Sequence, residues 1–299
     1  MKARLGIAPI GWTNDDLPEL GGDISLETCL ADSQAAGYSG VERGGKFPKT
    51  AAEMLEVLGR YDLQLVTGWY SGTVLDAELA AEKDKAREQI DLFRGVGCCC
   101  LVYGETAGTI QNIRNAPLNT RRRLSDDEIA DYGRRLTAFA EFCADEEMPL
   151  AFHHHMATAI ETEQDLDTLI ANTGEAVGLL YDAGHMAFAG GDILRVIDNH
   201  GPRIIHVHTK DVRNDVINAL DRSSESFLDA VIKGAFTVPG DGSIDFDTVV
   251  QRLADVGYEG WFIVEAEQDP VKAPPAEYAR IGYEALVGSL GKAGYEIVR

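Results

Sequence analysis

Short apolar segments alternate with longer helix-like segments along the whole chain, and this alternation constrains the fold more than any other feature. Each apolar segment is bounded by turn residues, an order typical of parallel sheets built from βαβ units. Strands are predicted at residues 4–10, 40–43, 64–70, 98–104, 149–155, 178–181, 204–209 and 260–267.

The segments between these strands carry start signals for helices. Ser25 and Ser125 stand at N-cap positions, and Glu128 lies three residues after Ser125, where it completes a capping box. Helices are predicted at residues 25–37, 50–61, 75–94, 125–147, 162–172, 193–200, 245–256 and 276–290.

Eight strand–helix units in a row predict one closed (β/α)₈ TIM barrel, an α/β fold, with residues 1–299 as a single domain. The length of 299 residues fits such a barrel with insertions, and no Gly-, Ser- or Pro-rich linker divides the chain. The insertions are predicted at 105–123 and 212–239, the second with a helical piece at 226–233. The alternative is an open doubly wound sheet, but no GxGxxG follows the first strand, which disfavours a dinucleotide-binding version.

Charge and composition exclude several classes of partner. The formal net charge is −22, which disfavours nucleic acid because a phosphate backbone would be repelled. No apolar run approaches the roughly 20 residues of a membrane span, and the first residues lack a signal-peptide layout. We therefore expect a cytoplasmic protein without nucleic-acid or membrane partners.

The cysteines are interpreted as structural. Their number is five, which is odd, and three of them are adjacent at 98–100. A disulfide framework is therefore not expected, and a reducing compartment is. Because neighbouring strand residues point to opposite faces, we expect that Cys98, Cys99 and Cys100 cannot converge on one metal.

Side chains that can act as acids, bases or metal ligands stand at the predicted C-terminal ends of the strands. In a barrel these ends open toward one mouth, where active sites lie. Strand alternation puts His206, His208 and Lys210 on one face. Mixed imidazole and carboxylate ligands suit Mn²⁺, Co²⁺, Fe²⁺ or Zn²⁺. The strand-end residues are Glu42, Trp69, Tyr70, His153, His154, His155, Asp182, His185, His206, His208, Lys210, Glu265 and Glu267.

Structural explanations are available for single members of this set. His154 is expected to face the helices, Asp182 alone can cap a helix, and Lys210 can pair with Asp211 or contact substrate. Asp, His and Glu at the ends of three consecutive strands are harder to explain structurally, because buried charges are costly unless they are paired or bind metal. We therefore predict a divalent-metal site.

Four strings, YDAGH, HVHTKD, VPGDGSIDF and WFIVEAE, resemble late-strand motifs of the xylose-isomerase-like TIM-barrel superfamily of sugar isomerases and epimerases. The resemblance implies one metal held from strands five to eight, most simply Mn²⁺ or Co²⁺, with Zn²⁺, Fe²⁺ or Mg²⁺ as alternatives. His185 and His208 would lie beside it. The implied metal ligands are Asp182, His206 and Glu265, and the fourth is either His153, where the superfamily usually has Glu, or a water.

Five further strings, GIAPIGWTNDDLPELGG, ERGGKFP, GWYSG, FHHHMAT and EAEQDP, resemble the inosose dehydratase family of inositol catabolism. This resemblance implies loss of water from 2-keto-myo-inositol, a small polyol ketone, to give a trihydroxycyclohexane-dione. A homo-oligomer is also expected. The candidate acids and bases are His155, His185, His208 and Lys210, and the candidate substrate contacts are Glu42, Trp69, Tyr70 and Arg213.

The runner-up is a metal-dependent ketose isomerase or 3-epimerase on the same barrel, which needs the same proton removal but returns the proton to carbon. A DNA-repair endonuclease of this fold would need a basic groove, which a net charge of −22 disfavours. A non-catalytic sugar-binding protein would leave the predicted metal site without a role.

Overall fold

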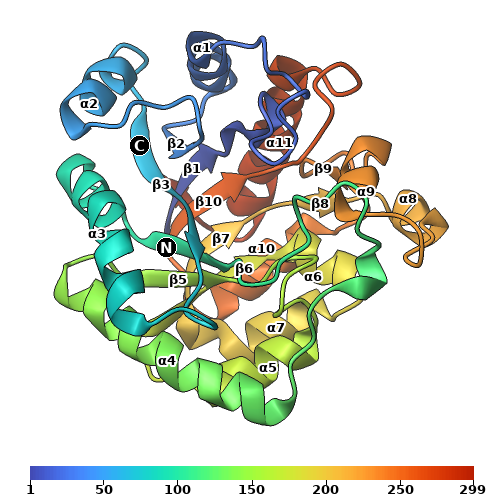
Figure 1. The fold of residues 1–299 in the computed structure, drawn as a ribbon. Coiled ribbons are helices and arrows are strands. Elements are labelled where there is room, and N and C mark those ends of the chain that lie inside the picture. The colour runs from blue at the N-terminus through green and yellow to red at the C-terminus, as the bar shows by residue number, and fades with distance from the viewer.

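Eight parallel strands close into a barrel in the computed structural model, which describes residues 1–299 (Figure 1). The last of them pairs with the first over Ala3–Gly260 to Ile7–Val264, which leaves no open edge. This confirms the predicted single barrel. The barrel strands are β1 (Lys2–Ile7), β2 (Gly40–Arg43), β3 (Gln64–Gly72), β4 (Leu101–Glu105), β5 (Leu150–His153), β6 (Val177–Asp182), β7 (Ile204–His208) and β10 (Gly260–Val264).

Helices surround the barrel, and several begin at the predicted caps. The Ser25 hydroxyl accepts a hydrogen bond from the Thr28 backbone, and Ser125 and Glu128 form the capping box. The helices are α1 (Leu26–Ala36), α2 (Ala51–Gly59), α3 (Leu79–Val96), α4 (Asp126–Asp145), α5 (Glu163–Ala171), α6 (Ala183–Ala189), α7 (Ile193–His200), α8 (Asn214–Ala219), α9 (Phe227–Lys233), α10 (Phe246–Asp255) and α11 (Pro275–Lys292). The short elements are η1 (Pro9–Gly11), η2 (Leu118–Thr120), η3 (Gly201–Arg203), β8 (Asp211–Val212), β9 (Phe236–Thr237) and β11 (Glu296–Ile297).

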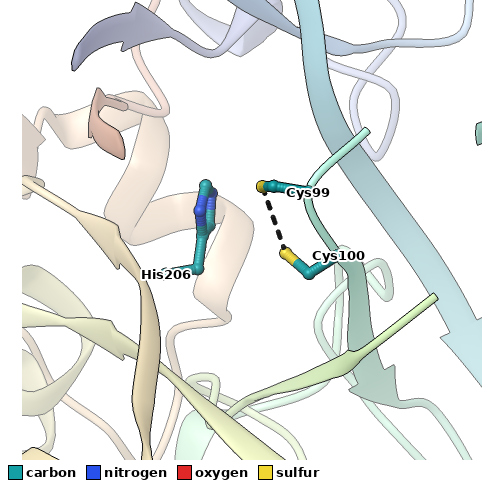
Figure 2. Close-up of side chains that lie close together, drawn as sticks. All are labelled: Cys99, Cys100 and His206. Carbon is teal, nitrogen blue, oxygen red and sulfur yellow. Dashed lines mark hydrogen bonds between the residues drawn. The ribbon is translucent and has the colours of Figure 1, made fainter. Parts of the chain in front are cut away.

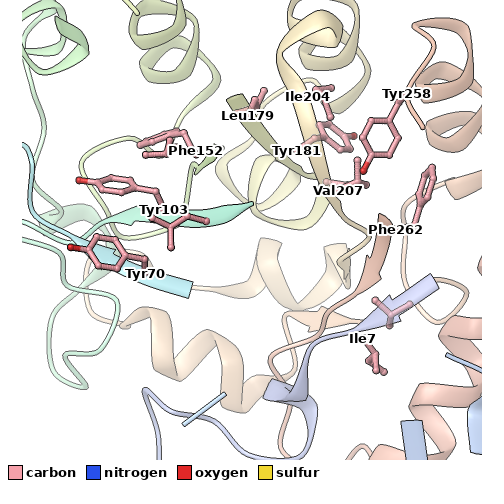
Figure 3. Close-up of a cluster of buried hydrophobic side chains, with 14 of the residues drawn as sticks. Ile7, Tyr70, Tyr103, Phe152, Leu179, Tyr181, Ile204, Val207, Tyr258 and Phe262 are labelled. Carbon is pink, nitrogen blue, oxygen red and sulfur yellow. The ribbon is translucent and has the colours of Figure 1, made fainter. Parts of the chain in front are cut away.

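Strand alternation divides the apolar core into two regions. Outward side chains such as Tyr103, Phe152 and Phe262 form a large cluster beneath the helices (Figure 3). Each fully buried side chain of this size contributes about 1.5–3 kcal/mol. Inward side chains such as Val102 and Leu180 form smaller clusters inside the barrel. The barrel interior is therefore apolar in part, and it becomes polar toward the C-terminal ends of the strands.

The two insertions lie against each other beside the mouth of the barrel. The backbone N–H groups of Leu118 and Asn119, in the first insertion, donate to the carbonyls of Glu225 and Arg222 in the second. An apolar cluster that includes Leu118 and residues of α9 joins them further. No helix of the structure combines the length and the apolar content that crossing a membrane requires.

Several predicted strand boundaries are wrong, two of them beside the site, and the helices α6 and α8 were not predicted. β4 begins at Leu101 rather than Cys98, and β5 ends at His153 rather than His155. Of these two helices, α6 begins directly after β6, and Asp182 is its N-cap. The side chain of Asp182 therefore serves the helix while it also ends a strand inside the barrel.

Candidate metal and substrate site

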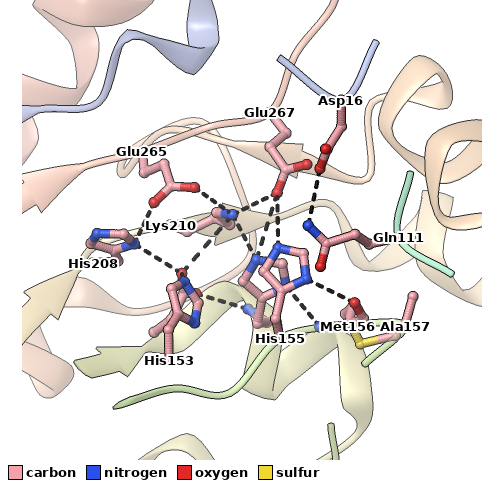
Figure 4. A network of polar contacts seen from close by, with 12 residues as sticks. Asp16, Gln111, His153, His155, Met156, Ala157, His208, Lys210, Glu265 and Glu267 are labelled. Carbon is pink, nitrogen blue, oxygen red and sulfur yellow. Dashed lines mark hydrogen bonds and ion pairs between the residues drawn. The ribbon is translucent and has the colours of Figure 1, made fainter. Parts of the chain in front are cut away.

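Four side chains meet at the C-terminal ends of consecutive barrel strands. They are His153 on β5, Asp182 on β6, His208 on β7 and Glu265 directly after β10, and their ligand atoms lie within 4.8 Å of one another. Oδ2 of Asp182 lies 3.6 Å from Nε2 of His153 and 3.5 Å from Nδ1 of His208. Oε2 of Glu265 contacts the same Nδ1 (Figure 4).

Both histidines are held in a defined tautomer by their other ring nitrogen. Nδ1 of His153 lies 2.5 Å from the carbonyl oxygen of His154, so it must carry the proton, and its Nε2 presents a lone pair. Nε2 of His208 donates to Oε1 of Glu42 at 3.1 Å, which leaves Nδ1 to face the group. A carbonyl or carboxylate behind each imidazole is the usual arrangement at metal sites.

Each of the two carboxylates likewise uses one oxygen for a neighbouring contact and turns the other toward the group. Oδ1 of Asp182 accepts the backbone N–H of His185 at 2.9 Å, and Oε1 of Glu265 lies 2.9 Å from the ammonium of Lys210. In each carboxylate, the second oxygen faces the two imidazoles.

Three of the four facing atoms are buried and have no hydrogen-bond partner outside this group: Oδ2 of Asp182, Nδ1 of His208 and Oε2 of Glu265. Unpaired buried polar atoms are rare and costly, so three at one point require an explanation. A divalent cation satisfies them all, and the donor set of two imidazoles and two carboxylates fits such an ion.

A second polar group surrounds Lys210, immediately beside the first. The Lys210 ammonium donates to Oε1 of Glu267 and to Nε2 of His185, each at 2.8 Å. The ring of His155 packs 3.8 Å from that of His185, centroid to centroid. His185 and Lys210 have no exposed surface, whereas His155 and Glu267 reach the cavity wall.

Burial and charge act against each other in this second group. Burial raises the pKa of the Glu267 carboxyl to about 7, although Lys210 opposes the shift. Burial alone would lower the pKa of Lys210, but Glu265 and Glu267 raise it, so the amine stays charged. Burial lowers the pKa of His155 to about 3, and its Nδ1 lies 2.8 Å from the Met156 carbonyl. His155 is therefore neutral, and its Nε2 carries the lone pair.

A cavity of about 660 Å³ opens above both groups, large enough for a six-membered polyol ring. His153, His155, His208, Glu265 and Glu267 contribute to its wall. The opposite wall comes from β2, β3 and the loops after β1 and β4, where it includes Glu42, Trp69, Asp16, Gln111 and Asn112.

Trp69 lies over the site, whereas Tyr70 does not. The Trp69 ring packs edge-on against His153 at 5.6 Å and His155 at 5.5 Å. Tyr70 points outward to the helices, where its hydroxyl donates to Glu82 at 2.6 Å. The expectation that both residues contact substrate is therefore corrected for Tyr70, because adjacent strand residues face opposite sides.

Arg213 is also outside the cavity. Its guanidinium donates to the carbonyls of Gly234 and Phe236 and to Asp241, so it fixes the second insertion. The expectation of a substrate contact is corrected to a structural role.

His206 lies two strand residues deeper in the barrel than the other three expected metal ligands. In the pairing of β6 with β7, Asp182 stands opposite His208, and His206 stands opposite Leu180. Two residues of strand correspond to about 6–7 Å, so His206 cannot join Asp182, whereas His208 does. The ligand set supported by the geometry is His153, Asp182, His208 and Glu265, which corrects the expected His206.

Residues of the two loops were missed as candidates. The Gln111 amide donates to Asp16 at 3.1 Å across the cavity mouth. The available signals were the polar NDD string after the first strand and the length of the 105–123 insertion.

A closed parallel barrel with imidazole and carboxylate groups at the C-terminal strand ends defines the class of TIM-barrel proteins whose site lies at the barrel mouth. The family model described as "Xylose isomerase-like TIM barrel" matches residues 30–287, and the chain belongs to this family.

Curated relatives match nearly the whole chain. The rhizopine catabolism protein MocC of Rhizobium meliloti is 46% identical over 298 residues, which cover 99% of this chain and 91% of that protein. An inosose dehydratase of Geobacillus thermodenitrificans is 41% identical over 280 residues, which cover 93% of this chain and 94% of that protein.

Solved structures agree on the fold at low sequence identity. An IolI protein with a bound zinc atom is 15% identical, with a TM-score of 0.70 over 97% of this chain and 99% of that one. An L-ribulose 3-epimerase is 16% identical, with a TM-score of 0.68 over 97% and 95% of the two chains. At these identities the likeness establishes the barrel alone.

Proposed function

We propose that this chain is a metal-dependent hydro-lyase that removes water from 2-keto-myo-inositol to give a trihydroxycyclohexane-dione. The observation that carries the proposal is the convergence of three buried ligand atoms, without hydrogen-bond partners outside their group, beneath a cavity of about 660 Å³. Inosose dehydratases that are 37–41% identical over at least 92% of the chain support the choice of substrate.

His153, Asp182, His208 and Glu265 would hold one divalent ion through the atoms that face one another. Imidazole and carboxylate donors suit Mn²⁺ or Co²⁺, and Zn²⁺ is the ion in the IolI structure of the same fold. When bound, the ion supplies a Lewis acid for the ketone oxygen of the substrate.

His155 and Glu267 are the residues that we propose move protons. His155 is neutral and at the cavity wall, so its Nε2 can take the proton from the carbon beside the ketone. Glu267 lines the cavity nearby and, when protonated, can donate to the departing β-hydroxyl, which leaves as water. A carbon–carbon double bond forms between the carbon that lost the proton and the carbon that lost the hydroxyl. The product is the enol form of the dione.

Lys210 and His185 act from behind this pair. Lys210 is fully buried and contacts both Glu265 and Glu267, so it fixes their positions and compensates their charge. His185 packs against His155 and sets its ring plane. Neither reaches the cavity, so we propose positioning roles in place of the direct roles expected from the sequence.

The decisive test measures absorbance at the dione band with metal-stripped protein, before and after addition of Mn²⁺ or Co²⁺, on 2-keto-myo-inositol. We expect a metal-dependent rise. A flat trace from folded, metal-loaded protein, together with turnover of a ketose in a parallel panel, would replace the dehydratase with the isomerase or 3-epimerase. The homo-oligomeric state and the cytoplasmic location stay predictions, and gel filtration with light scattering tests the first.

A further inference from the structure

A further group of potential metal ligands lies deeper in the barrel, apart from the metal-ligand group and the Lys210 group described above. It consists of Cys99, Cys100 and His206, whose ligand atoms are within 4.8 Å of one another. Figure 2 shows the imidazole facing the two sulfur atoms, which are 3.7 Å apart. Cys100 and His206 are buried, at 1% and 0% exposure.

The two thiols converge because neither lies in a strand. β4 begins at Leu101, and the chain bends at Cys99, so the alternation expected for a strand does not apply there. The expectation that these cysteines cannot share a metal is therefore corrected for Cys99 and Cys100. It holds for Cys98, whose sulfur instead approaches the Leu65 carbonyl at 3.7 Å.

His206 presents a lone pair to these thiols. Its Nε2 donates to Oε1 of Glu42 at 2.9 Å, so in the neutral imidazole Nδ1 is the unprotonated nitrogen. This Nδ1 is buried and has no hydrogen-bond partner. A carboxylate behind an imidazole whose other nitrogen is unpaired is the arrangement that supports metal ligation.

We propose that Cys99, Cys100 and His206 form a second metal site, which binds a thiophilic cation of the Zn²⁺ class through two thiolates and one imidazole. On binding, each thiol releases its proton to solvent and its sulfur coordinates the ion. Two sulfurs on one tetrahedral Zn²⁺, with Zn–S bonds of about 2.3 Å, are separated by about 3.8 Å. The observed 3.7 Å already matches this spacing.

The two sites differ in the ions that they favour and in their access. The site of His153, Asp182, His208 and Glu265, here the upper site, contains carboxylates and no sulfur. The site of Cys99, Cys100 and His206, here the deeper site, offers two soft thiolates and therefore selects softer ions. Cys99 is exposed at the protein surface, which gives an ion a route to this site that does not pass the substrate cavity. The proposal does not depend on which reaction the upper site performs.

Cobalt(II) titration of the metal-stripped, reduced protein tests the proposal, because only thiolate ligands give an intense sulfur-to-cobalt charge-transfer band in the near ultraviolet. We expect two equivalents to bind, one of them with this band. Cys99→Ser should lose the band and one equivalent. The matched control, Cys98→Ser, should keep both. Asp182→Ala should lose the other equivalent and keep the band.

Two results would overturn the proposal. The first is no charge-transfer band in folded wild-type protein that has all five thiols reduced. The second is a band of undiminished intensity in Cys99→Ser. Circular dichroism and a thiol count on each sample establish that the fold and the reduced state are intact.

Discussion

The two halves of the barrel contribute different things to the site. The half formed by β5, β6, β7 and β10 supplies all four of the proposed metal ligands and the Lys210 group. The half formed by β1 to β4 supplies Trp69, Glu42 and the loops that bear Asp16 and Gln111.

The difference follows from the positional accuracy that each task requires. Metal ligands must hold their positions within a few tenths of an ångström, and in this barrel they stand on or directly after strands whose neighbours are buried on both sides. A neutral polyol ring needs an apolar face and a few hydrogen bonds, which a tryptophan and the loops can provide. We therefore expect substitutions in the half formed by β5, β6, β7 and β10 to reduce kcat and metal content. Substitutions in the half formed by β1 to β4 should raise KM.

The largest effect is expected from His208→Ala. Loss of one of the four ligands should remove the metal and reduce kcat/KM by at least about a thousandfold, because Lewis-acid stabilisation is worth several kcal/mol. The matched control is His206→Ala on the same strand face, which should keep the upper metal. Mn²⁺ titration and initial rates measure both. An equal loss of Mn²⁺ binding in the two variants would refute the register argument.

Glu42 is an exception to this division between the halves, because it comes from β2 but supports His208 of the other half. Glu42→Gln tests this role. Its Oε1 accepts from both His206 and His208. Removing the charge behind a ligating imidazole costs about 10–100-fold in metal affinity or activity. Isothermal titration with Mn²⁺ measures the change. An unaltered affinity would mean that Glu42 acts on the substrate instead.

Trp69→Ala should raise KM by up to about tenfold and leave the metal bound, because aromatic contacts are worth about 0.5–1.5 kcal/mol. Gly104→Ala tests the same ring without removing it, since a Cβ at Gly104 would come within 2.0 Å of the Trp69 ring and displace it. Steady-state kinetics with metal analysis measure both variants. A fall in metal content at unchanged KM would contradict the division of labour.

The smallest effect is expected from Gln111→Ala. This change removes the hydrogen bond to Asp16 across the cavity mouth, which contributes about 0.5–1.5 kcal/mol. We expect KM to rise about two- to tenfold, with kcat and metal content unchanged. Asn112→Ala, in the neighbouring lining residue, is the matched control. A larger drop in kcat than in affinity would assign the loop to the chemical step.

The sequence predicted the barrel because every strand is short, apolar and followed by a helix signal, which are local properties. It also predicted the strand ends that hold the site. It did not distinguish His206 from His208, because both face inward. Only the pairing of β6 with β7, which is irregular after Leu179, decides which one stands opposite Asp182.

Two other errors have the same origin. The sequence predicts the same role for Trp69 and Tyr70. They are adjacent in one strand and therefore face opposite sides, Trp69 toward the cavity and Tyr70 toward the helices. The Cys99–Cys100 pair was assigned to a strand that begins one residue later, at Leu101. Phase and register depend on bends and irregular pairing, which arise from contacts between segments distant in sequence.

The contact between the two insertions has a consequence for how substrate enters. Backbone hydrogen bonds and an ion pair from Arg114 to Asp229 join the 105–123 and 212–239 segments, and parting them would also expose their shared apolar cluster. No backbone hydrogen bond joins the first segment to the loop after β1, where Gln111 meets Asp16 through side chains. We therefore expect the two insertions to move together when substrate enters, which would break the Gln111–Asp16 hydrogen bond and separate Leu17 of the loop after β1 from their apolar cluster.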